Sequence, residues 1–277
     1  MNTEADNSPR YAPAAGLVSD TTIVTCSNGL TATHITIPHR DNMKVYVARP
    51  EGIDQLPIVL VLSEAFGLHE HIEDVARRFA HAGYMAIAPD LMFRQGDPMA
   101  FTDIGSLVSD LLLRIPDAQV MADLDACVEW AITNGGDQKK LSATGFCWGG
   151  RWTWLYAAHR AMYSAVVWYG IVDGKKSGIF PDTSEFFSRH PIDVTAGLAT
   201  PVLGLYGAMD EAIELHTIDA MKKRLADGSD AARQSRIIIY TEAGHAFFAD
   251  YRNSYRADEA HDAWHRCLCW MVNPVAE

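Results

Sequence analysis

The chain has 277 residues, 48% of them hydrophobic and 21% charged, which is ordinary for one globular α/β domain. Its formal net charge of −12 argues against nucleic acid and anionic membranes as partners, because both would repel it. The five cysteines lack the spacing of a disulfide framework, and neither a secretory signal nor a membrane-spanning apolar run is evident, so we expect a cytoplasmic protein.

The N-terminal part of the chain predicts an arm followed by the start of a sheet. Residues 1–20 are polar, and we expect a flexible arm there, ahead of a single domain over residues 21–277. Two stretches of alternating polarity within residues 30–48 predict an antiparallel β-hairpin at a sheet edge. The continuous apolar run over residues 57–63 is typical of a parallel strand that is buried on both faces.

Helices and strands then alternate along the rest of the chain. The pattern predicts helices over 72–82, 118–132, 149–161, 213–226 and 255–271, and strands over 84–88, 141–145, 164–169, 201–206 and 236–240. Such alternation is typical of the α/β class, with a doubly wound, mostly parallel sheet and helices on both faces. Residues 173–197 interrupt it and predict a long loop near the carboxyl ends of the strands, where loops often cover a pocket.

A candidate nucleophile lies where a predicted strand turns into a predicted helix, in Gly145-Phe-Cys147-Trp-Gly149. The spacing is that of the Gly-x-Ser-x-Gly turn of α/β-hydrolases, with cysteine in place of serine. This turn usually holds the nucleophile at positive φ, and its flanks lack side chains because the strand and the helix approach closely. The helix N-terminus favours a thiolate. The alternative is a buried structural cysteine in a tight turn.

Two further candidates follow later strands, in the chain order nucleophile, acid, histidine that α/β-hydrolases use. Asp210 follows the strand over 201–206, and His245 follows the strand over 236–240, where Gly244 would permit a sharp turn. We expect His245 to take the thiol proton and Asp210 to orient the imidazole. The alternatives are a helix N-cap for Asp210 and a hydrogen-bonded loop histidine for His245.

The loop after the strand over 57–63 carries the remaining candidates. In this type of hydrolase the loop supplies one oxyanion-hole N–H, which we assign to Ala65, with Trp148 supplying the other. Glu64 ends an apolar strand and needs a partner there, so we expect it to hydrogen-bond Cys147 or to cap the next helix. His69 and His71 lack an evident third metal ligand, which favours a helix N-terminus over a metal site.

These motifs resemble the dienelactone hydrolase (carboxymethylenebutenolidase) family, in the family's order, over about residues 30–272. The matching blocks are Ser63–Gly67, Ala88–Leu91 with Arg94, Gly145–Gly150, Gly207–Asp210 and Ala243–Phe247. The resemblance implies an α/β-hydrolase fold, a Cys147–His245–Asp210 triad and a carboxylate at Glu64 that holds the resting thiol. It also implies hydrolysis of a small ester or lactone, typically a dienelactone from aromatic degradation, through an acyl-enzyme and without metal or organic cofactor.

The chain departs from this family where the substrate carboxylate is held. The well-known members use two arginines, but Ala249 stands four residues after His245 and no arginine lies near Gly105. Arg94, Arg151 or Arg252 would have to supply the charge instead. The expected partner is a small ester or lactone, and the oligomeric state is left open. Alternative functions are a carboxylesterase for a different small ester, a non-catalytic binding protein of the same fold and a thiol redox protein.

Overall fold

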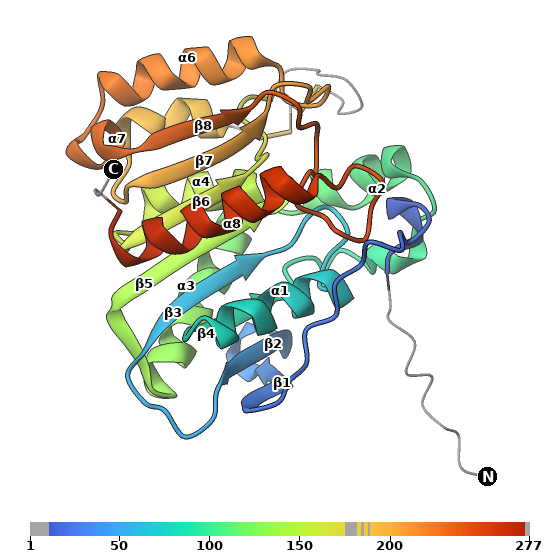
Figure 1. Ribbon diagram of the computed structural model, residues 1–277, viewed down its shortest axis with the longest axis vertical. Coiled ribbons are helices and arrows are strands. Elements are labelled where there is room, and N and C mark those ends of the chain that lie inside the picture. The colour runs from blue at the N-terminus through green and yellow to red at the C-terminus, as the bar shows by residue number, and fades with distance from the viewer. Residues whose placement is uncertain (1–10, 175–181, 184–185, 188, 275–277) are drawn as a thin grey trace.

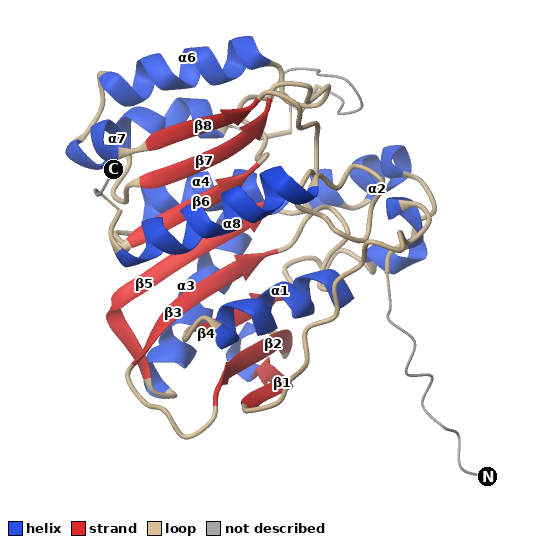
Figure 2. Ribbon diagram, viewed as in Figure 1, coloured by secondary structure: helices blue, strands red, loops and turns tan. Residues whose placement is uncertain are grey.

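Eight strands form one sheet in the order β1-β2-β4-β3-β5-β6-β7-β8 in the computed structural model, which describes residues 11–174, 182, 183, 186, 187 and 189–274. The expected hairpin is β1 (Leu30–Ile37) with β2 (Met43–Pro50), paired antiparallel at one edge. Figure 2 shows the strands in red. The strands from β3 onward run parallel to one another: β3 (Leu56–Leu62), β4 (Met85–Pro89), β5 (Gly136–Phe146), β6 (Ser164–Trp168), β7 (Val202–Gly207) and β8 (Arg236–Tyr240).

Helices cover both faces of this sheet, which confirms the expected α/β fold class. On one face lie α1 (Glu70–His81) and α8 (Ala257–Val272), and on the other lie α3 (Asp117–Thr133) and α4 (Trp148–His159), as Figure 1 shows. α6 (Leu215–Ala226) follows β7. Within the described ranges, none of the helices has the length and hydropathy that crossing a membrane requires.

Several short helices lie outside the predicted elements. Three are α-helical, α2 (Ile104–Asp110), α5 (Pro191–Val194) and α7 (Asp230–Gln234), and α5 falls within the stretch predicted as a long loop. The others are 3₁₀ turns: η1 (Pro13–Ala15), η2 (Pro38–Arg40), η3 (Pro98–Ala100), η4 (Leu112–Arg114) and η5 (Thr195–Gly197). Segments this short display too little periodicity to be distinguished from loops by sequence pattern.

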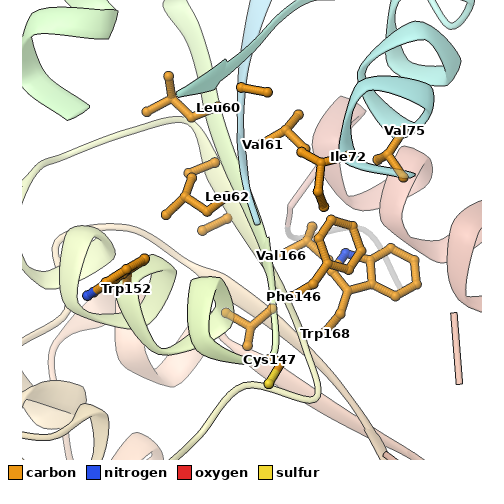
Figure 3. Packing of buried hydrophobic residues seen from close by; sticks show 14 of the residues in the cluster. Leu60, Val61, Leu62, Ile72, Val75, Phe146, Cys147, Trp152, Val166 and Trp168 are labelled. Carbon is orange, nitrogen blue, oxygen red and sulfur yellow. The ribbon is translucent and has the colours of Figure 1, made fainter. Parts of the chain in front are cut away.

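The strand β3 illustrates why a continuous apolar run was the correct signal for a central strand. Figure 3 shows Val61 directed toward Ile72 of α1, while Leu60 and Leu62 point to the opposite side of the strand. All three β3 side chains are fully buried. Because helices cover both faces, neither face of the strand needs polar residues, and the alternation seen in the edge hairpin is absent.

Residues 11–25, which we call the N-terminal strap, lie along the surface of the domain. The backbone N–H of Ser19 donates to the carbonyl oxygen of Tyr251 at 2.9 Å, and the N–H of Thr25 donates to Asp74 Oδ1 at 2.5 Å. The flexible arm expected over residues 1–20 stays a prediction, and residues 1–10 lie outside the described residues. These contacts to the domain are made by backbone N–H groups.

Candidate active site

Cys147 forms the turn between β5, which ends at Phe146, and α4, which begins at Trp148. Its φ of 51° lies on the side of backbone space that non-glycine residues rarely occupy, as the elbow interpretation predicted. A Cβ on Gly149 would lie 2.4 Å from the carbonyl oxygens of Leu62 and Ser63. The first turn of α4 therefore approaches the end of β3 only because this position has no side chain. Figure 3 shows Cys147 at this turn.

The loops after β7 and β8 meet at the same edge of the sheet. The backbone N–H of Met209 donates to the carbonyl oxygen of Ala243 at 2.9 Å, which ties the two loops together. Within this contact, Nδ1 of His245 lies 2.9 Å from Oδ2 of Asp210. The Asp210 side chain is fully buried, so water does not weaken the interaction.

The other oxygen of the Asp210 carboxylate serves the turn that follows it. Oδ1 accepts hydrogen bonds from the backbone N–H groups of Ala212, at 2.8 Å, and Ile213, at 2.9 Å. The two interpretations of this residue from the sequence, a histidine partner and a backbone cap, are thus both present in the structure. Three donors fix the orientation of the carboxylate.

The pKa of His245 is shifted by burial and by two neighbouring groups, Cys147 and Asp210. Burial by itself would lower the pKa, but the charges of Cys147 and Asp210, and hydrogen bonds to both, raise it to about 10. The imidazole therefore lies between the sulfur and the carboxylate. A histidine in this position holds a proton next to a thiolate, and it can accept the proton of the thiol and later return it.

Strained backbone conformations gather at this edge of the sheet. Besides Cys147, Tyr169 has a φ of 39° directly after β6, and Ala246 has a φ of 59° directly after His245. The sharp turn at the histidine thus depends on Ala246, whereas the sequence had suggested Gly244. Residues in sparsely populated conformations persist where the surrounding structure holds them, and they are frequent at active sites.

Glu64 lies buried beside these residues and is held by two tyrosines. The hydroxyl of Tyr251 donates to Oε2 at 2.8 Å, and the hydroxyl of Tyr169 donates to Oε1 at 3.5 Å. Burial raises the pKa of Tyr169 well above its usual value, and the charges of Glu64 and Cys147 raise it further, so the hydroxyl remains a donor. Among the described residues, the carboxylate bonds to these tyrosines and not to the sulfur, which differs from the contact expected with Cys147.

Two buried residues next to Glu64 and Cys147 in the chain, Ala65 and Trp148, carry the backbone N–H groups expected to stabilise an oxyanion. Ala65 follows Glu64 in the loop after β3, and Trp148 is the first residue of α4, where backbone N–H groups have no partner within the helix. Both residues are buried. Neither N–H donates a hydrogen bond to another described residue. These are the two donors that the sequence assigned to the oxyanion hole.

Arg94 and Arg151, expected as possible substrate contacts, are engaged elsewhere. Arg94 Nη1 lies 2.7 Å from Oδ2 of Asp123 in α3, and Arg151 Nη1 lies 2.6 Å from Oδ1 of Asp117. Both guanidinium groups are thus paired with carboxylates of α3. The sequence did not reveal these aspartates as partners, because they lie 29 and 34 positions away in the chain.

Arg252 is an arginine whose charge interacts with residues of the site. Burial would lower its pKa, but the charges of Glu64, Tyr251 and Cys147 raise it. Its guanidinium lies over the ring of Phe66, 5.3 Å from the ring centre. In the described parts of the chain no carboxylate lies within 4 Å of it, unlike Arg94 and Arg151. The positive charge of Arg252 is therefore not neutralised by a described carboxylate within 4 Å.

The sequence analysis did not identify Tyr169 and Tyr251 as site residues. A signal for Tyr169 was its position, because it follows β6 directly and the carboxyl ends of the strands form the site. Tyr251 lies six positions after His245 in an irregular loop, where no periodicity points to its orientation. His69 precedes α1 and His71 lies in its first turn, in line with a helix N-terminus. No three potential ligands gather as a metal site within the described residues.

Comparisons with known proteins agree with the fold. The model of the "Dienelactone hydrolase family" matches residues 43–274, a segment that contains all the site residues above. A "Putative carboxymethylenebutenolidase" of Escherichia coli O157:H7 is 48% identical over 264 residues, which cover 94% of each chain. Its counterpart in Salmonella typhimurium is 47% identical over 265 residues, covering 95% of this chain and 94% of the relative. The crystal structure of a "Putative Dienelactone Hydrolase" from Klebsiella pneumoniae superimposes with a TM-score of 0.80 at 47% identity, covering 88% of this chain and 99% of that chain.

Proposed function

We propose, since the chain belongs to the dienelactone hydrolase family and is a hydrolase of carboxylic esters or lactones, that Cys147, His245 and Asp210 form its catalytic triad. The observation that carries this proposal is the 2.9 Å contact between His245 and Asp210, beside a cysteine at a strained strand-to-helix turn. Loops from three parts of the chain meet there. A structural cysteine has no need of a buried histidine–carboxylate pair beside it.

The first half of the reaction forms an acyl-enzyme. The sulfur of Cys147 attacks the carbonyl carbon, and His245 holds the proton that the thiol loses. The carbonyl oxygen becomes an oxyanion, which the N–H groups of Ala65 and Trp148 stabilise. When the intermediate collapses, the bond from carbon to the leaving oxygen breaks, and His245 protonates that oxygen. In a lactone both fragments remain in one molecule, now attached to the sulfur as a thioester.

The second half of the reaction restores the enzyme. His245, again without its extra proton, takes a proton from water as the water oxygen attacks the thioester carbonyl. The same two N–H groups stabilise the second oxyanion, and the carbon–sulfur bond then breaks to release the acid and Cys147. Asp210 keeps Nδ1 of the imidazole occupied, so that Nε2 is the nitrogen that exchanges protons in both halves.

The charges around the sulfur favour an anionic substrate. Arg252 supplies a positive charge that interacts with Cys147 and Glu64, and no described carboxylate lies within ion-pair distance of it. A carboxylate on a small lactone would find this cation in a site where water is largely excluded, which strengthens the attraction. We therefore propose a dienelactone-type substrate in preference to a neutral ester.

A substrate panel tests the proposal. The wild-type protein, Cys147→Ala and the matched control Cys269→Ala, which changes an exposed cysteine, are compared on a dienelactone, a neutral lactone and p-nitrophenyl acetate. We expect turnover that Cys147→Ala abolishes and Cys269→Ala retains, a thioester adduct on Cys147 detected by mass spectrometry, and a preference for the anionic lactone. Turnover that survives Cys147→Ala would refute the mechanism. A preference for neutral esters would assign a carboxylesterase, and binding without turnover a non-catalytic protein.

A further inference from the structure

Tyr251 links the buried carboxylate of the site to a part of the chain that the triad mechanism does not use. Its side chain is 1% exposed, and its hydroxyl donates to Oε2 of Glu64 at 2.8 Å. Its ring lies against the rings of His71, at 4.9 Å, and His69, at 5.2 Å. The position of the hydroxyl is thus set by packing around the ring, and Tyr251 does not belong to the triad or to the oxyanion hole.

The N-terminal strap holds Tyr251 from the other side. The ring of Tyr11 stacks on the ring of Tyr251, with centres 5.0 Å apart and planes 21° apart. The backbone N–H of Ser19 donates to the carbonyl oxygen of Tyr251, and Thr21 Oγ1 donates to the carbonyl oxygen of Asp250 at 2.6 Å. The strap therefore contacts both the side chain and the backbone of this segment.

Helix α1 holds the same segment from another side through contacts to Asp250. The Asp250 carboxylate pairs with Arg78, lies 3.6 Å from Nδ1 of His71, and accepts the backbone N–H of Ile23 at 3.4 Å. Burial raises the pKa of Asp250, but His71 and Arg78 outweigh this and lower it below the usual value, so the residue stays ionised. Asp250 and Tyr251 are thus held between α1 and the strap.

We propose that Tyr251 is a positioning residue for the hydrolase reaction, which keeps the Glu64 carboxylate away from the Cys147 sulfur and is itself kept in place by the N-terminal strap. The inference rests on the proposed function, because it assigns Tyr251 a role in the state of the nucleophile. Glu64 has two oxygens, and Tyr251 and Tyr169 each donate to one of them. Removing the Tyr251 hydroxyl leaves one buried oxygen without its donor, which is costly. We expect the thiol of Cys147 to replace it as the donor, since the charges of Cys147 and Glu64 act on the same two tyrosines.

The consequence for the nucleophile follows from the charges around it. Several charged or titratable groups interact with the sulfur or with the groups that touch it: Glu64 from the loop after β3, Tyr169 from the loop after β6, Asp210 from the loop after β7, and His245, Tyr251 and Arg252 from the loop after β8. If Glu64 turns toward the sulfur, it adds a negative charge beside the thiolate and accepts a hydrogen bond from the thiol. Both effects favour the protonated, unreactive form.

The test compares two variants that each remove one tyrosine hydroxyl. Tyr251→Phe removes the donor to Glu64, and the control Tyr163→Phe removes a hydroxyl that donates to the carbonyl oxygen of Val272. We measure the rate of Cys147 alkylation by iodoacetamide from pH 5 to 10, and kcat/KM for p-nitrophenyl acetate. In Tyr251→Phe we expect the midpoint of the alkylation profile to move to higher pH and kcat/KM to fall about tenfold. Tyr163→Phe keeps the wild-type profile.

A second pair of variants tests the strap without touching the site. Thr21→Val removes the hydrogen bond to the carbonyl of Asp250, and Thr33→Val makes the same change at an exposed position of β1. We expect Thr21→Val to shift the alkylation profile in the same direction as Tyr251→Phe, by a smaller amount, and Thr33→Val to leave it unchanged. A purely structural role would lower the melting temperature without moving the pH profile.

The outcomes separate this inference from the proposed function. If Tyr251→Phe and Tyr163→Phe have the same alkylation profile, the positioning role of Tyr251 is wrong, even when the wild-type protein hydrolyses esters through Cys147. If Thr21→Val matches Thr33→Val, the role of the strap is wrong. If no substrate is turned over but the Tyr251→Phe profile moves, the effect of Tyr251 on the Cys147 thiol stands and the proposed reaction fails, because alkylation does not require turnover.

Discussion

Nδ1 of His245 lies 2.9 Å from Oδ2 of Asp210, although the two residues are 35 positions apart in the chain. The contact follows from topology, because β7 and β8 are neighbouring parallel strands and the loops at their carboxyl ends meet at one edge. The elbow with Cys147 opens at the same edge, after β5. An acid–base pair and a candidate nucleophile are therefore brought together by the sheet, and the predictions below test what each part contributes.

Replacing the candidate nucleophile by serine should remove most activity and leave the fold intact. A serine hydroxyl is much harder to deprotonate than a thiol. We expect kcat/KM of Cys147→Ser for p-nitrophenyl acetate to fall by roughly three orders of magnitude, with an unchanged melting temperature. Activity within about tenfold of the wild-type value would contradict the assignment.

The pairing of His245 with the sulfur should make the thiol reactive at neutral pH. The pKa of His245 is raised to about 10 by Cys147 and Asp210, against the effect of burial, so the imidazole stays protonated beside the sulfur up to about pH 10. By reciprocity the imidazolium stabilises the thiolate. We expect the iodoacetamide reaction of Cys147 to be nearly constant from pH 7 to 9 in the wild-type protein. In His245→Gln the rate should rise steeply over this range, like that of an ordinary thiol near pH 8.5.

The buried His69 should make the folded protein sensitive to acid. Burial lowers its pKa from 6.5 to about 3, with smaller contributions from His71 and Arg252. Below pH 6.5 His69 therefore becomes protonated in the unfolded chain but stays neutral in the folded protein. The free energy of unfolding consequently decreases as the pH falls below 6.5. At pH 5 the loss is roughly 2 kcal/mol. Urea unfolding of His69→Phe should show a smaller difference between pH 7 and pH 5 than the wild-type protein.

An exposed histidine provides the control for that experiment. The side chain of His216 is 70% exposed, so His216→Gln should retain the full difference in unfolding free energy between the two pH values. Equal acid sensitivity in His69→Phe and His216→Gln would show that His69 is not the group responsible.

A methyl group at Gly149 should disturb both stability and activity. It would lie 2.4 Å from the carbonyl oxygens of Leu62 and Ser63, so α4 would have to move away from the end of β3. We expect Gly149→Ala to lower the free energy of unfolding by about 1–3 kcal/mol and to reduce kcat, because the N–H of Trp148 moves with the helix. In Gly197→Ala, where a Cβ meets nothing within 4 Å, urea unfolding and kcat should match the wild-type protein.

The charge of Arg252 should matter for anionic substrates in particular. We expect Arg252→Gln to lower kcat/KM for an anionic dienelactone by about tenfold or more, and to change it much less for p-nitrophenyl acetate. Arg114→Gln removes the same charge from a side chain that is 66% exposed, and it should affect neither substrate. An equal loss on both substrates would indicate that Arg252 supports the site structure and does not recognise a substrate anion.

Much of the fold was predictable because its signals are local. The apolar run of β3, the alternation in β1 and β2 and the turn at Cys147 each lie within a few consecutive residues, where periodicity and glycine spacing are informative. Short helices were not predicted, because α2 with seven residues and α5 with four display too little periodicity. At the histidine loop, the sequence pointed to Gly244, but the strained residue is Ala246, because the neighbouring segments hold the turn.

The sequence by itself determined the class of the fold, the strand-to-helix turn at Cys147 and the order in which the candidate acid and histidine follow it. Only the tertiary structure decided that Arg94 and Arg151 pair with aspartates of α3, that Glu64 rests on Tyr169 and Tyr251, and that the strap holds Tyr251. The physical reason is that these contacts join residues far apart in the chain. Such a contact depends on which loops the folded sheet brings together, and it leaves no pattern in neighbouring residues.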